Sequence, residues 1–295
     1  MTFRGLWALL KQTIIEWQQD KIPLLAAALA YYTVFSLAPL LVIAIAIVGA
    51  VLGQQAAQNQ IVMQFRGLIG EQGAQAIQAI INNAQQPGSG GTVATIVSII
   101  TLLFGASVVF GQLQEALNTI WEVQPKPGLN IKGFLQNRLL SFAMVLVIGF
   151  LLLVSLFFSA ALAALESFFG TAFPNLIELG RFINIVLTLG GAAVLFALIY
   201  KVLPDVQVSW RYLWIGAGVT SVLFTIGKSL IGFYLGNSSV SSSYGAASSV
   251  IGLLIWIYYS AQILLFGAEF TQVYAKRQGA LITASSYAQP KNKSH

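Results

Sequence analysis

The stretch Phe224–Gly232, FTIGKSLIG, is where this chain comes closest to a motif with defined chemistry, because Gly-Lys-Ser ends many phosphate-binding loops. Such a loop requires a further glycine five positions before Gly227, and Val222 stands there. The flanking residues are apolar instead of glycine-rich. We therefore expect no nucleotide site. Lys228 is then a single charge within an apolar run, and its role must be inferred from the residues around it.

The composition is that of a membrane protein. Of the 295 residues, 57% are hydrophobic and 8% are charged, whereas soluble domains are about a quarter charged. The chain has no cysteine, and its only histidine is His295. This excludes disulfides, thiolate metal sites and catalytic cysteines, and it argues against histidine bases and histidine-ligated metals. We expect no enzyme activity and no cofactor or metal.

Six apolar runs are long enough to cross a bilayer core of about 30 Å. They cover Ile22–Leu52, Thr92–Leu113, Leu139–Leu165, Phe182–Leu203, Tyr212–Leu235 and Ala247–Tyr274. The pattern predicts an all-α integral membrane protein with six transmembrane helices in a single domain, residues 1–278. The remainder, residues 279–295, is polar, and we expect it to be disordered.

The basic residues predict the orientation. Twelve of the fifteen lie before the first run, between the second and third, at the two sides of the loop between the fourth and fifth, or after the sixth. The positive-inside rule then places both termini in the cytoplasm. Because these residues are spread over four segments beside the span ends, we expect them to contact lipid headgroups and no nucleic acid.

Two segments outside the spans have amphipathic patterns. Residues 3–18 space Trp7, Leu10 and Ile14 as a helix lying at the membrane interface. Residues 53–91 predict two short amphipathic helices on the outer side, which either cap a cavity or bind a partner. Glycine pairs such as Gly49 and Gly53 permit close helix packing, within one chain or in a homo-oligomer.

The first run contains polar residues at helical spacing. Tyr32, Ser36 and Pro39 lie at i, i+4 and i+7 and share a face, which we expect to point into the protein. Pro39 removes a backbone hydrogen bond and predicts a kink. Broken helices at substrate sites and purely structural kinks both have this pattern, so both interpretations stay open.

Two other runs carry carboxylates. Near the end of the second run one face carries Gly111, Glu115, Asn118 and Glu122. In the sixth run Gln262 and Glu269 lie on one stripe. Both glutamates should lie near the cytoplasmic boundary. They either form a cation or proton site, or line a vestibule, or simply emerge into the headgroups.

Lys228 should lie in the outer half of the membrane, on a face with Ser221 and Thr225. A lysine at the centre of a transmembrane helix costs about 2.5–3.5 kcal/mol on insertion scales. The side chain either extends outward to the interface or meets an anionic group, such as a lipid phosphate, in a groove open to the outer leaflet.

The chain resembles the YihY/BrkB family of bacterial inner-membrane proteins, once mislabelled as a ribonuclease. The resemblance covers residues 5–278, and five stretches carry it: LAAALAYYTVFSLAPLL, QEALNTIWEV, YKVLPDVQVSWRYLWIGA, the FYLGNSS…YGAASS region and LIWIYYSAQILLFGAEFTQVYA. It implies six spans, both termini inside and an inner-membrane location. It implies no settled activity, although one branch of the family has been linked with lipid export.

The preferred hypothesis is a transporter or flippase-like protein for an amphipathic, anionic lipid. Lys228 would attract the headgroup, while Glu115, Asn118 and Glu269 would line the cytoplasmic mouth. No ATP site is visible. The alternative is a scaffold that does not transport and that anchors an envelope-assembly partner through residues 53–91.

Overall fold

The structure is a computed structural model, and it describes residues 3–84, 108–126, 174–237, 248–285 and 288–291. The predicted third span and most of the predicted second span lie outside these residues. The number of spans therefore stays a prediction.

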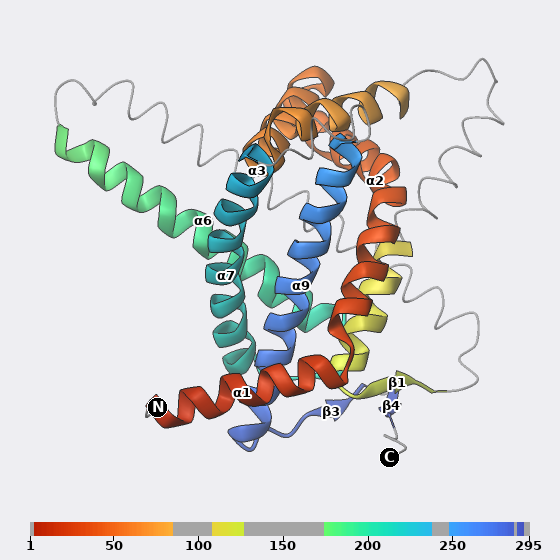
Figure 1. The fold of residues 1–295 in the computed structure, drawn as a ribbon, viewed down its shortest axis with the longest axis vertical. Helices are drawn as coiled ribbons and strands as arrows, with labels where there is room; N and C mark the ends of the chain where they lie inside the picture. The colour runs from red at the N-terminus through yellow and green to blue at the C-terminus, as the bar shows by residue number, and fades with distance from the viewer. Residues whose placement is uncertain (1–2, 85–107, 127–173, 238–247, 286–287, 292–295) are drawn as a thin grey trace.

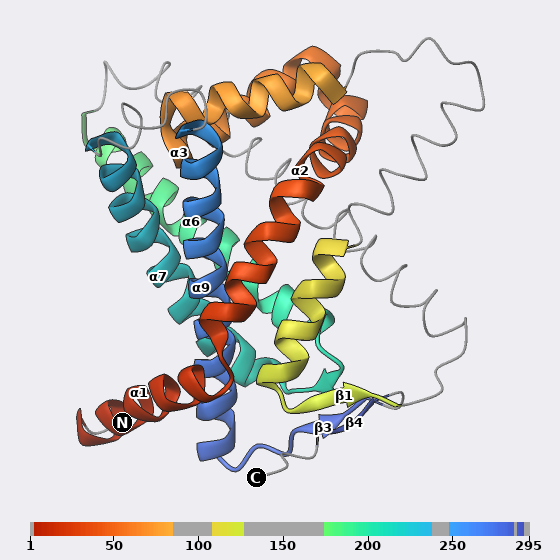
Figure 2. The same ribbon diagram turned by 45° about the vertical axis from the view of Figure 1, so that its right-hand side comes forward.

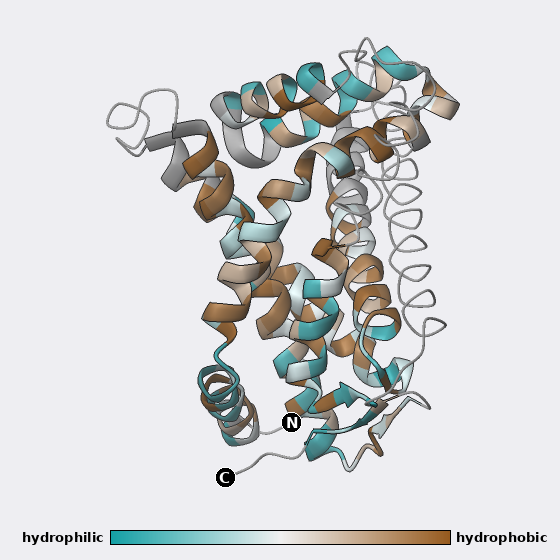
Figure 3. Ribbon diagram, turned by 90° about the vertical axis from the view of Figure 1, so that its right-hand side faces the viewer, coloured by the Kyte–Doolittle hydropathy of each residue, from teal (hydrophilic) through white to brown (hydrophobic). Residues whose placement is uncertain are grey.

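The described part is mostly helical, and its helices follow the apolar runs. They are α1 (Phe3–Gln19), α2 (Ile22–Leu52), α3 (Gln54–Ala84), an unlabelled helix at residues 108–120, α6 (Pro174–Val202), α7 (Trp210–Asn237) and α9 (Ser248–Arg277). Within these residues, three helical segments are long and apolar enough to cross a membrane: Ile22–Ala50, Trp210–Ile231 and Val250–Arg277. Figures 1 and 3 show α2, α7 and α9 running between the two ends of the molecule, with apolar residues along their middle parts.

Helix α2 has the predicted bounds of the first span. It begins after Lys21 and ends before Gly53, and both residues have positive φ, 52° and 85°. Glycine adopts such a φ without strain, and its N–H bonds the Gly49 carbonyl at 2.9 Å. The helix continues through Pro39 without interruption. A kink there stays a prediction.

Helix α3 corrects one expectation, because residues 54–84 form one helix and not two. Of the apolar positions expected to form the buried faces of the two helices, Ile61, Val62, Ile77 and Ile81 are buried, and Phe65 and Ile80 are partly buried. They pack with residues of α2 and α9 in a single cluster. The intervening glycines lower helix propensity by about 1 kcal/mol each without forbidding the conformation. Helix α3 therefore covers one end of the bundle, here called the α3 end (Figure 2).

The opposite end carries four short strands and is called the strand end. β1 (Val123–Pro125) pairs antiparallel with β4 (Ala288–Pro290), and β2 (Val206–Gln207) pairs antiparallel with β3 (Thr283–Ala284). The expected disorder of residues 279–295 is thus wrong where β3 and β4 form. Pairing uses main-chain groups of distant segments, which a local hydropathy pattern cannot reveal.

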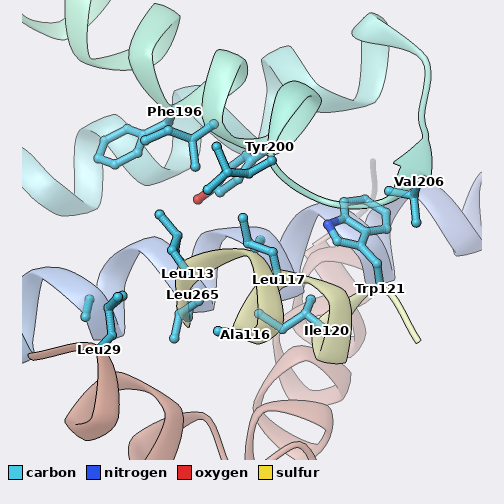
Figure 4. Close-up of a cluster of buried hydrophobic side chains, with 14 of the residues drawn as sticks. Leu29, Leu113, Ala116, Leu117, Ile120, Trp121, Phe196, Tyr200, Val206 and Leu265 are labelled. Atoms are coloured by element: carbon cyan, nitrogen blue, oxygen red, sulfur yellow. The ribbon is translucent and has the colours of Figure 1, made fainter. Parts of the chain in front are cut away.

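The larger core cluster lies toward the strand end and joins α2, α6, α7, α9 and the helix at 108–120. Figure 4 shows the 108–120 helix placing Leu113, Leu117 and Ile120 in it, opposite Phe196 and Tyr200 of α6. These side chains fix the 108–120 helix against the rest of the bundle.

Helix α1 crosses the strand end and is held to α9. Leu9 is fully buried against Phe270 and Val273. From the end of α9, Arg277 donates from Nη2 to the Ala8 carbonyl and from Nε to Gln12 Oε1, both at 2.8 Å. The predicted helix at residues 3–18 is confirmed, and its place at a membrane surface stays a prediction.

Candidate functional site

The helix at residues 108–120 brings the predicted polar face to the strand end. Three residues of this face, Gly111, Glu115 and Asn118, line one pocket. Glu122, the fourth, lies in the turn after the helix and does not line it. The end of this helix is fixed to α9 because Gln272 Nε2 donates to the Ile120 carbonyl at 2.6 Å. A buried helix end needs such a partner for its last carbonyls.

Asp205, in the turn between α6 and β2, is the centre of a buried polar network that the sequence analysis did not identify. Its side chain is 1% exposed. Oδ1 accepts from Gln114 Nε2 at 2.9 Å, and Oδ2 accepts from Asn118 Nδ2 at 2.8 Å. Asn118 Oδ1 in turn accepts the backbone N–H of Asp205 at 2.8 Å. Such hydrogen bonds compensate for the burial of the carboxylate.

Backbone hydrogen bonds connect the turn at Asp205 and the turn at Glu122 to the C-terminal segment. Ser285 N–H donates to the Asp205 carbonyl at 2.9 Å, and Lys291 N–H donates to the Glu122 carbonyl at 2.8 Å. Three distant segments therefore meet around a pocket of about 440 Å³. Its polar lining includes Gln114, Glu115, Asn118, Gln124, Asp205 and Lys291.

Two pairs of opposite charges at the strand end differ in their contacts. Lys276 on α9 forms an ion pair with Glu122, with Nζ and Oε1 3.1 Å apart. Glu115 and Lys291 both line the pocket and are exposed, and among the described residues no ion pair joins them. No metal-binding group of three or more acidic, histidine or cysteine residues occurs in the described ranges.

Glu269 and Gln262 lie on α9, apart from the lining of this pocket. Glu269 is fully buried, and Gln262 Nε2 donates to Tyr258 Oη at 2.8 Å. Gln262 is only partly buried, so the two residues of the predicted stripe differ in exposure. Glu115 lines this pocket and Glu269 does not, so the two carboxylates do not share it.

Lys228 lies in the interior of α7, which is a helix and not a phosphate-binding loop. Gly227 packs against Tyr259 and Ile263 of α9, while Lys228 is exposed. Ser221 and Thr225 donate their hydroxyl hydrogens to carbonyls of their own helix, Gly218 at 2.9 Å and Ser221 at 2.8 Å. Ser221 is buried, so the three predicted residues do not share one equally accessible face.

The predicted face of α2, with Tyr32, Ser36 and Pro39, likewise contains both buried and exposed residues. Ser36 is 3% exposed and Pro39 is partly buried, but Tyr32 is 37% exposed, contrary to the expected inward orientation. The Tyr32 ring lies edge-on to that of Tyr31, which also contacts Phe35. The inward side of α2 is set by contacts with α3 and α9, which a spacing rule cannot locate.

The main omissions of the sequence analysis are Asp205 and the contacts between α7 and α9. The stretch VLPDVQV contains a helix-ending proline followed by an acidic residue, and this signal could have identified a turn with a buried carboxylate. Its partners Gln114 and Asn118 lie about 90 positions earlier, and nothing in the local pattern connects them.

Comparison with known proteins gives the relatives of this chain. A family model described as "Virulence factor BrkB" matches residues 13–292. A "UPF0761 membrane protein" of Aeromonas salmonicida is 29% identical over 261 residues, covering 87% of this chain and 85% of that protein. One of Glaesserella parasuis is 28% identical over 227 residues, covering 77% and 74% of the two chains. No solved structure matches the chain.

Proposed function

This chain belongs to the BrkB family of membrane proteins, and from that premise we propose that it is a multi-pass protein of the bacterial inner membrane that binds an anionic amphipathic lipid and moves it between leaflets. Both termini lie in the cytoplasm in this proposal, and the chain supplies no nucleotide site of its own. The role is that of a transporter or flippase, with coupling to an ion gradient or a partner protein.

The position of Lys228 carries the proposal. Its neighbours on α7 include strongly exposed apolar side chains: Ile226 is 54%, Leu230 60% and Phe233 73% exposed. Such a surface suits acyl chains, yet it holds one exposed cation. Among the described residues Lys228 has no hydrogen bond or ion pair. An anionic headgroup beside this helix would offset the cost of placing the charge in lipid.

The test is lipid movement in proteoliposomes with fluorescent anionic and zwitterionic lipids, under imposed proton and sodium gradients. We expect Lys228→Ala to slow the anionic lipid several-fold and Lys228→Arg to retain movement. Arg211→Ala is the matched control, because Arg211 is an exposed cation at the other end of α7. Folded wild-type protein that moves no lipid under any gradient overturns the transport proposal.

The alternative is a scaffold for an envelope protein, and the exposed amide groups of α3 favour it. Gln55, Asn59 and Gln75 are exposed, whereas Ile61, Ile77 and Ile81 of the same helix are buried. Replacing these three residues with alanine removes the polar surface and leaves the core contacts. Loss of an envelope phenotype with unchanged lipid movement would support the scaffold.

A further inference from the structure

The pocket at the strand end is a second candidate site, far along the bundle from Lys228. Figure 2 shows the C-terminal half of α7 at the α3 end, and Lys228 belongs to that half. The pocket is formed by the 108–120 helix, β1, Asp205 and Lys291. A pocket of about 440 Å³ falls within the roughly 300–1,000 Å³ usual for small-molecule sites. The pocket at the strand end is therefore a site separate from any lipid path along α7.

Two opposite charges line this pocket without neutralising each other. Within the described chain, neither the Glu115 carboxylate nor the Lys291 ammonium forms an ion pair or a side-chain hydrogen bond. Nearby, Lys276 and Glu122 do pair, at 3.1 Å. Close to this ion pair, Glu115 and Lys291 are thus held on separate segments around a cavity.

In the buried network of Asp205, Gln114 and Asn118, the carboxylate of Asp205 already has hydrogen-bond partners. Each oxygen of Asp205 accepts an amide hydrogen, and Asn118 uses both ends of its amide on Asp205. Gln114 donates through Nε2, which leaves its Oε1 as an acceptor. Asp205 therefore positions the 108–120 helix and adds negative potential at the pocket, while Glu115 and Lys291 are the groups left to bind a ligand.

We propose that this pocket binds a zwitterion that carries an ammonium group and an anionic group. Glu115 accepts hydrogen bonds from the ammonium, and Lys291 donates to the anion. A ligand with one charge of each sign leaves the summed charge of the pocket unchanged and satisfies both side chains. Glycerophosphoethanolamine is a probe with this chemistry, whether the natural source is the headgroup of an aminophospholipid or a free zwitterion. The proposal does not depend on lipid transport.

The experiment is calorimetric titration of the purified full chain with glycerophosphoethanolamine, compared with glycerophosphoglycerol, which lacks the ammonium. We expect saturable binding of the first probe only. Because hydrogen bonds to charged groups are the strong ones, Glu115→Gln and Lys291→Ala should each raise the Kd about tenfold or more.

Matched controls separate a specific site from general charge effects. Glu16→Gln and Lys11→Ala change charges on α1, at the same end, and should leave the Kd unchanged. Lys228→Ala should also leave it unchanged, which distinguishes this site from the proposed lipid surface. Absence of saturable binding to wild-type protein, or an equal loss in the α1 controls, overturns the proposal.

A competition experiment identifies the source of the zwitterion. The chain is placed in nanodiscs of phosphatidylethanolamine or phosphatidylglycerol, and the soluble probe is titrated again. Weaker apparent binding only in phosphatidylethanolamine upholds the site and assigns it to a lipid headgroup. Equal binding in both upholds the site and assigns it to a free zwitterion.

Discussion

Gly216 of α7 lies so close to Thr271 of α9 that a Cβ at position 216 would overlap the threonine side chain. The same contact recurs one turn away with the roles exchanged, because Thr220 of α7 lies against Gly267 of α9. Each threonine donates its hydroxyl to the glycine carbonyl of its own helix, at 2.7 Å for Thr220 and 2.6 Å for Thr271. Small residues allow this close approach of apolar helices, and the internal hydrogen bonds satisfy both hydroxyls.

Replacement of Gly216 with alanine should therefore destabilise the protein. Thr271 is fully buried and its hydroxyl is bonded, so it cannot easily move away. Overpacking of this kind costs about 1–3 kcal/mol. Thermal unfolding in detergent measures the change. Gly218→Ala is the control on the same helix, because nothing lies within 4 Å of the Cβ it would add. Equal stability of the two variants would contradict the predicted contact.

Tyr200→Phe tests the hydroxyl that joins three helices. Tyr200 of α6 donates to the Leu264 carbonyl of α9 at 2.7 Å and lies 3.0 Å from Thr220 Oγ1 of α7. Its loss should cost about 1 kcal/mol, the net value of a typical hydrogen bond. Tyr212→Phe is the control for removing a tyrosine hydroxyl, because within the described residues the Tyr212 hydroxyl makes no hydrogen bond, while its ring packs against Tyr274. The prediction fails if both changes lower the midpoint of unfolding equally.

Asp205→Asn should disturb the strand end. The introduced NH₂ group would face an amide donor of either Gln114 or Asn118, and one buried donor would lose its acceptor. An unsatisfied buried group costs about 1–3 kcal/mol. Glu71→Gln, which weakens an exposed ion pair with Arg66, should cost less than about 1 kcal/mol. Faster hydrogen exchange in residues 108–126 would localise the damage, and unchanged exchange would argue against the network.

The absence of cysteine makes the proposed orientation directly testable. Asn83 is exposed at the α3 end, and Thr283 is exposed in β3 at the strand end. We expect Asn83→Cys to react with a membrane-impermeant thiol reagent in cells whose outer membrane is permeable, and Thr283→Cys to react only after the inner membrane is opened. Labelling of both positions from the same side would refute the orientation.

The sequence by itself determined the elements whose signal is local. The unbroken apolar run from Ile22 to Leu52 predicted α2 to the residue, and the face of Gly111, Glu115 and Asn118 followed from helical spacing. It also predicted the family, which the match to residues 13–292 confirms. These features depend on hydropathy and on the 3.6-residue period, which are properties of neighbouring residues.

Only the tertiary structure decided which faces meet. Glycine spacing suggested close packing at Gly49 and Gly53, where the chain turns from α2 into α3, while the interlocking contacts lie at Gly216 and Gly267. Tyr32 is exposed because α3 and α9 cover a different side of α2. Asp205 meets Asn118 across 87 positions, and the C-terminal strands pair through backbone groups alone. These contacts arise when distant segments fold together, and no local pattern encodes their partners.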